Sequence, residues 1–341
     1  MKANRSIGWT AVMLVLGCAA AWAGSETRLG TGGLQQLRQP VGARSTALAG
    51  ADIGSVSGAE ALFYNPSGIA ATDHTTEVLF SNTSYIADMD VNFVGIVQSM
   101  GDLGTLGLSA KVFSVGQIER TTESNPDGTG ELFSPTTTII GLGYGKRMTD
   151  RVNFGGTLNY YSERILQETA SGVSFDFGFQ YDTGYRGMKL GMSMKNFGSN
   201  GQFSGTDFER NILYQEDDPQ SGSRTVTNES SRFELPALFQ LGLSLPLSQG
   251  QTRSSVHGLF QSNSFGRDEA RVGFELGYRD AAALRAGYVY NGNEQNLFGL
   301  SYGVGLYTKL GTSNLGVDYA GQTVKDGIFD DIHHVAVSLH F

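Results

Sequence analysis

Apolar side chains occupy every second position in most of the chain from about residue 77 to the end. Alternation with a period of two predicts β-strands that have one apolar face and one polar face. The clearest segment places Val173, Phe175, Phe177, Phe179 and Tyr181 on one face, and Ser174, Asp176, Gly178, Gln180 and Asp182 on the other.

Segments of this kind follow one another at a regular spacing. We expect strands near 76–85, 90–98, 104–115, 137–147, 151–162, 170–183, 186–196, 234–247, 252–262, 269–279, 282–291, 298–310, 313–321 and 331–341. An even number of about 14 strands is typical of bacterial outer-membrane barrels, in which short turns face the periplasm and long loops face outward. The turns at Thr149-Asp150 and Arg279-Asp280-Ala281 are short, whereas the connections 116–136 and 197–233 are long. The pattern therefore predicts an all-β protein, a transmembrane antiparallel β-barrel.

Charged residues fall on the polar face of these strands. Such charges would cost roughly 2 to 4 kcal/mol each at the middle of the lipid, so we expect them in the lumen. They are Asp176, Asp182, Lys189, Arg271, Glu275, Arg279 and Arg285. Two interpretations remain open: a salt-bridged interior that also holds an N-terminal segment, or a selectivity lining.

The first 23 residues have the pattern of a secretory signal peptide. Lys2 and Arg5 precede a short apolar run, and Ala21-Trp22-Ala23 supplies a cleavage site. The one cysteine, Cys18, lies within this segment, so we expect no disulfide and no cysteine-ligated metal in the mature chain. A lipoprotein box at Val15-Leu16-Gly17-Cys18 is the alternative.

The last expected strand ends the given sequence on an aromatic residue. Val335, Val337, Leu339 and Phe341 alternate on one face. A terminal Phe after alternating apolar residues resembles the signal that the outer-membrane barrel-assembly machinery reads.

Residues 24–75 do not alternate, and they contain two distinctive motifs. Between Val41 and Ala51, small residues recur at helical spacing, which predicts a short helix that packs closely against a wall. The run Asn65-Pro66-Ser67-Gly68 then predicts a turn just before the first strand. We expect lumenal glycines to let this segment approach the wall, namely Gly141, Gly143, Gly145, Gly299, Gly303 and Gly305.

With these motifs the sequence resembles the FadL-like barrels, and more closely their PorV/PorQ-type relatives. The resemblance rests on the Gly-Ala-Arg segment at Gly42, on the aromatic-Asn-Pro-small-Gly run ending at Gly68, and on the aromatic C-terminus. It implies a small helical or irregular plug at 24–75 inside a barrel at 76–341. Gly42, Arg44, Asn65, Pro66 and Gly68 would belong to that plug, with turn and packing roles favoured over ligand contact.

Charge and motif content narrow the function. The 24 basic and 33 acidic residues give a net charge of −9, which makes nucleic acid an improbable partner. None of the five histidines lies in a nucleophile motif, so we expect no enzyme and no cofactor. His333-His334 cannot chelate one ion from a strand, because neighbouring side chains point to opposite faces. Two loop segments could bind calcium through oxygen ligands, Asn125-Pro126-Asp127-Gly128 and Asp217-Asp218. We favour the interpretation that both are solvated turns.

Three functions remain. PorV-type relatives serve protein secretion, so the resemblance favours a secretion accessory that binds exported proteins or a translocon through its long loops. The alternative is a FadL-like passive transporter of hydrophobic small molecules such as fatty acids, which an apolar pocket formed by Phe203, Phe208, Ile212 and Leu213 would support. The third is a plugged structural barrel. In each case we expect an outer-membrane location, with membrane lipid, lipopolysaccharide and the barrel-assembly machinery as partners.

Overall fold

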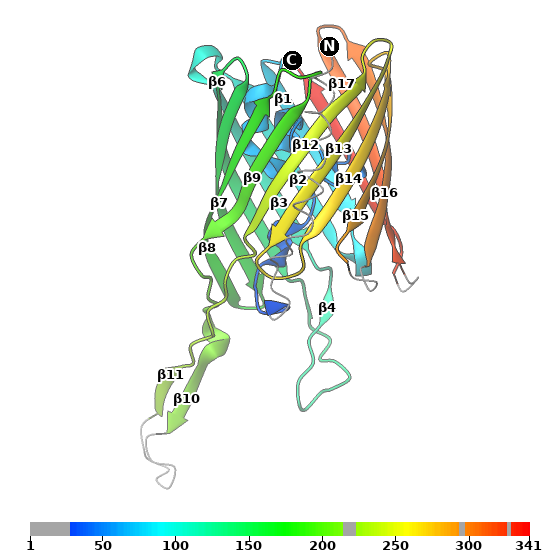
Figure 1. Ribbon diagram of the computed structural model, residues 1–341. Helices are drawn as coiled ribbons and strands as arrows, with labels where there is room; N and C mark the ends of the chain where they lie inside the picture. Colours follow the sequence, from blue (N-terminus) through cyan, green and yellow to red (C-terminus); the bar gives the residue numbers. More distant parts are fainter. Residues whose placement is uncertain (1–27, 214–222, 293–296, 326–328) are drawn as a thin grey trace.

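A computed structural model describes residues 28–213, 223–292, 297–325 and 329–341 (Figure 1). The expected signal peptide and the Asp217-Asp218 pair lie outside these residues. Among the described residues, no helix combines the length and the apolar character that crossing a membrane requires.

Fourteen antiparallel strands close into a single barrel, as the alternation predicts. β1 pairs with β2 on one side and with the last strand, β18, on the other, which closes the sheet. The barrel strands are β1 Thr76–Ser84, β2 Asp90–Ser99, β3 Thr105–Ser114, β6 Thr136–Thr149, β7 Val152–Ile165, β8 Glu168–Asp182, β9 Lys189–Gly198, β12 Leu238–Ser248, β13 Thr252–Asn263, β14 Glu269–Tyr278, β15 Ala282–Tyr290, β16 Phe298–Leu310, β17 Ser313–Val324 and β18 Ile332–His340. The all-β barrel prediction is therefore confirmed.

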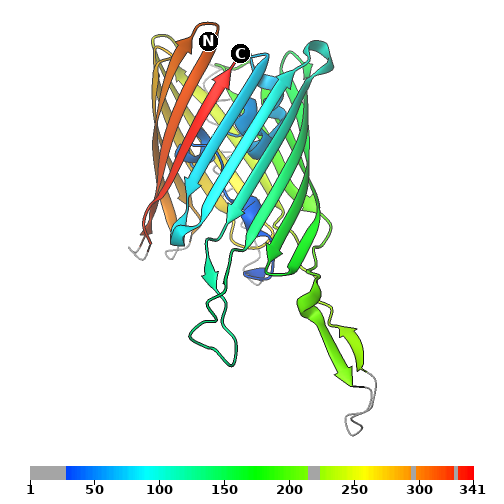
Figure 2. The same cartoon turned by 180° about the vertical axis from the view of Figure 1, so that it is seen from behind.

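The two long connections carry small hairpins of their own. β4 (Ile118–Glu119) pairs with β5 (Leu132–Phe133), and β10 (Glu209–Leu213) pairs with β11 (Ser223–Thr227). Both hairpins project from the same end of the barrel, away from the C-terminus (Figures 1 and 2). We call this the loop end and the opposite end, which holds Phe341, the turn end.

The two faces of the wall differ as the alternation predicts. On β8, Phe175 and Phe177 are 40% and 44% exposed on the outside, whereas Asp176 and Gln180 are buried on the inside. Exposed Leu, Ile, Val, Phe and Tyr side chains recur in the same way on the other barrel strands. The outer surface is therefore the apolar one, as in a barrel that faces lipid.

Most residues between Leu34 and Ile69 are buried inside the barrel, and this segment forms a plug. Its helical pieces are η2 Gln35–Arg38, α2 Arg44–Ala47, η3 Gly58–Glu60, α3 Ala61–Tyr64 and η4 Pro66–Ala71. Gln39 contacts Tyr85 at the loop end, and the Ala59 amide donates to Glu77 near the turn end. The main apolar core, which includes Val41, Ile53 and Ile69, is accordingly enclosed by the barrel wall.

The helix expected between Val41 and Ala51 is only α2, which is four residues long. Ala49 and Gly50 have φ angles of 56° and 68°, and this left-handed turn ends the helix. The small residues still permit close packing: a Cβ at Gly303 would lie 2.6 Å from the Ala47 Cβ.

The expected close approach of plug and wall is confirmed at some glycines only. Gly143, Gly145 and Gly303 face Leu62, Ile69 and Ala47 of the plug. Gly141, Gly299 and Gly305 lie against barrel side chains instead, because neighbouring strands fill the space beside them. Further glycines that face the plug, unforeseen from the sequence, include Gly95, Gly107, Gly155, Gly178, Gly191, Gly242, Gly273 and Gly287.

Candidate functional site

The Asn65 turn fastens the plug to the wall near β8. The fully buried Asn65 amide donates to the Ile53 carbonyl at 2.8 Å and to the Phe179 carbonyl at 3.2 Å, and its Oδ1 accepts from Ser67. Pro66 begins η4, where a proline loses no helical hydrogen bond. Gly68 leaves no room for a side chain, since a Cβ would lie 2.8 Å from the Ala61 Cβ. Asn65, Pro66 and Gly68 therefore shape the plug backbone and hold it against the wall.

A buried carboxyl group lies beside Gly42 in the middle of the plug. Gly42 has a φ of 71°, and its amide donates to Ser81 Oγ of β1 at 3.0 Å. Glu60 accepts a 3.1 Å hydrogen bond from the Ser45 amide. Burial, reinforced by the nearby Asp52 carboxylate, raises the pKa of Glu60 to about 8. Glu60 is therefore largely protonated at neutral pH.

Arg44 joins the plug to a chain of charges on the wall. Its Nε and Nη2 each lie 3.3 Å from a carboxylate oxygen of Glu275 on β14. Glu275 also accepts from Arg285 of β15 at 2.6 Å, and Arg285 continues to Asp318 of β17 at 2.6 Å. Tyr307 donates to the same Asp318 oxygen at 2.7 Å. The structure thus brings three of the expected charged residues, Arg44, Glu275 and Arg285, into one network.

A second ionic contact lies nearer the loop end. Glu269 of β14 accepts from Arg271 at 2.6 Å and from the plug residue Arg38 at 3.4 Å. Arg271 also donates to the Ala49 carbonyl at 3.1 Å. The expected lumenal residue Arg271 therefore holds plug backbone.

Other residues expected in the lumen lie elsewhere. Asp182 ends β8 and accepts a 2.8 Å hydrogen bond from the Gly184 amide of the following turn. Arg279 is exposed in the β14–β15 turn, where it donates to Gln251. Lys189 is half-buried at the start of β9, in register with Asp182. Alternation extends to the strand ends, but the enclosed lumen does not, so these side chains sit at the turn end of the barrel.

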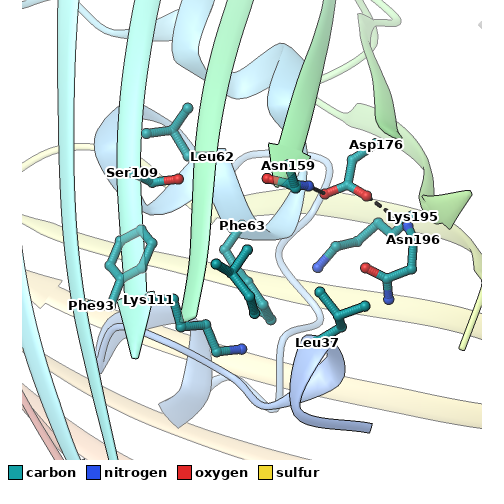
Figure 3. Close-up of a pocket in the computed structure, with 11 residues that line it drawn as sticks. Leu37, Leu62, Phe63, Phe93, Ser109, Lys111, Asn159, Asp176, Lys195 and Asn196 are labelled. Carbon is teal, nitrogen blue, oxygen red and sulfur yellow. Dashed lines mark hydrogen bonds between the residues drawn. The ribbon is translucent and has the colours of Figure 1, made fainter. Parts of the chain in front are cut away.

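A bulge in the wall positions two further residues. Opposite Asp176 of β8, the partner strand β9 has both Lys195 and Asn196, and Asn196 adopts a φ of 59°. The Asn196 amide donates to Asp176 at 2.6 Å, and Asn159 donates to its other oxygen at 2.9 Å (Figure 3). Asp176 therefore has a hydrogen-bond partner on each carboxylate oxygen, and the charge of the nearby Lys195 acts on it without a direct hydrogen bond.

Sequence reasoning missed two inward lysines that flank Phe63 of the plug. Lys111 Nζ lies 4.7 Å and Lys195 Nζ 3.5 Å from the centre of the Phe63 ring. Lys111 also donates to the carbonyls of Gln36 and Gln39, at 2.8 and 2.6 Å. Both lysines occupy the polar face of an alternating segment, so the pattern placed them in the lumen even though neither was singled out.

Two cavities separate plug and wall in this region. The smaller, of about 30 Å³, is lined by Phe63, Lys111, Asp176 and Lys195 among others (Figure 3). The larger, of about 220 Å³, extends toward the loop end. Its polar lining is Gln35, Arg38, Gln39, Thr46, Lys195, Gln240, Gln261, Glu269, Arg271 and Gln322, and its apolar and aromatic lining includes Phe63, Tyr64, Tyr85, Leu238, Val289 and Phe298. This larger cavity is the candidate site.

The remaining expected sites do not form part of it. Phe203 contacts Phe233, and Ile212 is 49% exposed on the projecting β10–β11 hairpin, so the expected apolar pocket under the loops is not assembled from them. His333 contacts Tyr319, while His334 is buried against Thr83. Within the described residues, no group of three or more His, Cys, Asp or Glu could hold a metal ion.

His257, unforeseen as a paired residue, lies among serines. It is hydrogen-bonded to Ser244 and Ser255 at 2.9 Å each, and Ser55 of the plug lies 3.5 Å from its Nδ1. His257 lines neither of the two cavities. We therefore read the group as packing between plug and wall.

A closed barrel of 14 strands with an internal N-terminal plug defines the class: an outer-membrane-type β-barrel. No family model and no curated protein matches the sequence. Among solved structures, the toluene transporter TodX of Pseudomonas putida has a TM-score of 0.57 at 12% identity, covering 88% of this chain and 98% of its own.

Two further structures share this barrel. The monoaromatic hydrocarbon channel CymD has a TM-score of 0.56 at 12% identity and covers 88% of this chain and 96% of its own. A FadL homologue of Pseudomonas aeruginosa has a TM-score of 0.50 at 13% identity, covering 88% and 97% respectively. The chain therefore has the fold of the FadL-like barrels.

These comparisons correct the favoured functional expectation. The secretion-accessory hypothesis rested on a closer likeness to the PorV/PorQ type, whereas the similar structures include a toluene transporter and a hydrocarbon channel. The motifs that suggested it, around Gly42 and Asn65, are used in this structure to fasten the plug inside the barrel. The secretion hypothesis, which rested on the PorV/PorQ likeness, is therefore contradicted.

Proposed function

We propose that this chain is a passive outer-membrane channel that admits small, partly apolar molecules at its loop end, with the plug as its gate. The supporting observation is the cavity of about 220 Å³ between plug and wall, which combines aromatic and polar lining. A cavity of about 150 Å³ is enough to bind benzene in a protein interior. The shared fold with hydrocarbon channels supports the same class of function.

Movement of the plug is part of this proposal. Toward the turn end, Ile53, Val56, Leu62 and Ile69 pack in the apolar core, which closes the path below the cavity. The plug is held to the wall by hydrogen bonds, ion pairs and packing, and such contacts can be released together without breaking a covalent bond. A solute that enters the cavity would therefore pass on only when the plug shifts.

A disulfide between plug and wall tests the gate. A Cβ at Gly95 of β2 would lie 3.3 Å from the Ala59 Cβ, close to the roughly 3.8 Å of a disulfide. We expect Gram-negative cells that produce the Ala59→Cys/Gly95→Cys protein, with Cys18 replaced by serine, to take up labelled benzyl alcohol only after reduction. Each single-cysteine variant is the control and should be insensitive to reductant.

A plugged structural barrel is the competing function. It predicts that influx equals that of cells without the barrel, whether the protein is oxidised or reduced. That outcome, with correctly folded protein in the membrane, would overturn the channel proposal.

The placement in the membrane and the route of assembly are part of the same proposal. Exposed apolar side chains cover the outer face of the strands, which suits contact with outer-membrane lipid and, on the outer leaflet, lipopolysaccharide. Val335, Val337, Leu339 and Phe341 lie on that outer face of the C-terminal segment, available to the barrel-assembly machinery before β18 pairs with β1.

A further inference from the structure

Lys195 is a buried cation without a hydrogen-bond partner in the described part of the chain. It is only 4% exposed, its ammonium group forms no hydrogen bond or ion pair with the described residues, and its Nζ lies 3.5 Å from the centre of the Phe63 ring. In Figure 3 the side chain points away from Asp176, toward Phe63 and the cavity. A buried ammonium group is costly unless it is paired, so its position calls for an anionic partner.

Lys195 lies next to empty space that an anionic partner could occupy. Lys195 lines both cavities, including the one of about 220 Å³. Lys111, the matched lysine on the other side of Phe63, is satisfied by two plug carbonyls and serves to hold the plug. Lys195 is therefore the lysine that is left available to a ligand.

The charge of the larger cavity favours an anion. Arg38, Arg271 and Lys195 line it against one carboxylate, Glu269, a formal balance of +2. Glu269 is already shared by the two arginines, at 3.4 and 2.6 Å. One carboxylate offsets only one of these two arginines, so a net positive charge remains in the lining, and the carboxylate nearest to Lys195, Asp176, has both of its oxygens hydrogen-bonded to other residues.

The rest of the lining describes the body of the ligand. Leu238 of β12 is in register with Lys195, and Phe63, Tyr85 and Phe298 provide aromatic surface around the same cavity. Gln240 donates to Gln261 at 2.7 Å, but its own Oε1 is buried without a partner. The cavity thus offers an ammonium group, an apolar surface and one free acceptor.

We infer that this cavity binds a small organic monocarboxylate with a compact apolar body, its carboxylate on Lys195 and its body against the aromatic side chains. A hydroxyl group on that body would satisfy Gln240. The inference rests on the proposed function and makes it more specific, since it assigns the channel an anionic solute class in place of a neutral hydrocarbon.

Binding to the purified full chain in a neutral detergent tests this inference. The probes are benzoate and its uncharged counterpart, benzyl alcohol, and titration calorimetry measures both. We expect the wild-type protein to bind benzoate more tightly, and Lys195→Met to weaken benzoate binding tenfold or more because a charge-assisted hydrogen bond is lost, while benzyl alcohol is unaffected. Lys195→Arg should retain most of the preference.

Lys309→Met is the matched control, because Lys309 is exposed near the turn end of β16 and lines neither cavity. Equal benzoate affinity in wild-type and Lys195→Met proteins, or no benzoate binding to the wild type, would overturn the inference. If benzoate binding depends on Lys195 but cells show no influx of benzyl alcohol through the barrel, the binding site is supported and the channel proposal is refuted. If benzyl alcohol enters cells through the barrel but the purified protein does not prefer benzoate, the channel proposal is supported and the anion site is refuted.

Discussion

Replacing Arg44 with methionine should loosen the plug. Arg44 makes two hydrogen bonds of 3.3 Å to Glu275, and 36% of its side chain is exposed. Charge-assisted hydrogen bonds contribute roughly 1.5 to 3 kcal/mol each when short and buried, so about 1 kcal/mol each is appropriate at this length and exposure. The loss is then about 2 kcal/mol.

The loss of Arg44 should carry no further free-energy cost from an unpaired buried carboxylate. After the substitution, Glu275 still pairs with Arg285 at 2.6 Å, so no carboxylate is left buried without a partner. Methionine also replaces most of the apolar length of the arginine side chain. A change of about 2 kcal/mol corresponds to a roughly 30-fold larger population of the undocked plug.

Cysteine labelling measures that population. Ala59 is fully buried between plug and wall, so in an Ala59→Cys, Cys18→Ser background a maleimide reacts only when the plug undocks. We expect Arg44→Met to raise the labelling rate about 30-fold.

Arg120→Met is the control for this experiment. Arg120 forms an exposed 2.9 Å ion pair with Glu131 in the β3–β6 connection, and exposed pairs contribute about 0 to 1 kcal/mol. Equal labelling rates in the Arg44 and Arg120 variants would refute the reasoning, since the plug would then be held without the Arg44 contact.

Two further predictions concern packing and pH. A Cβ at Gly191 would lie 2.6 Å from the Gly54 amide nitrogen, so Gly191→Ala should destabilise the docked plug by about 1 to 3 kcal/mol, whereas Gly258→Ala, with no neighbour within 4 Å, should be neutral in the same labelling assay. The pKa of Glu60 rises from 4.5 to about 8 in the docked plug, so docking carries no penalty from Glu60 below pH 4.5 and weakens as the pH rises toward about 8. Channel opening in planar bilayers should therefore increase between pH 5 and pH 8.5, and Glu60→Gln should abolish that dependence; an equal increase in both proteins would contradict it.

The alternation of side chains by itself determined the wall of this protein. Because side chains on a strand point to opposite faces in turn, the period of two placed Phe175 outside and Asp176 inside without any knowledge of their neighbours. The same pattern located the fourteen barrel strands but not the hairpin strands β4, β5, β10 and β11 in the long connections, and the glycine and proline content marked the turn at Asn65-Pro66. These are local properties of the backbone, so they can be predicted from the sequence alone.

Only the tertiary structure decided which lumenal residues meet. Arg44 and Glu275 are 231 positions apart, and their contact depends on the closure of the barrel and on where the plug lies along its axis. The same closure gives Lys111 two carbonyl partners and leaves Lys195 facing a cavity. Alternation assigns a side chain to a face, but it does not give the stagger between strands or the height of a residue in the lumen, and these quantities select its partner.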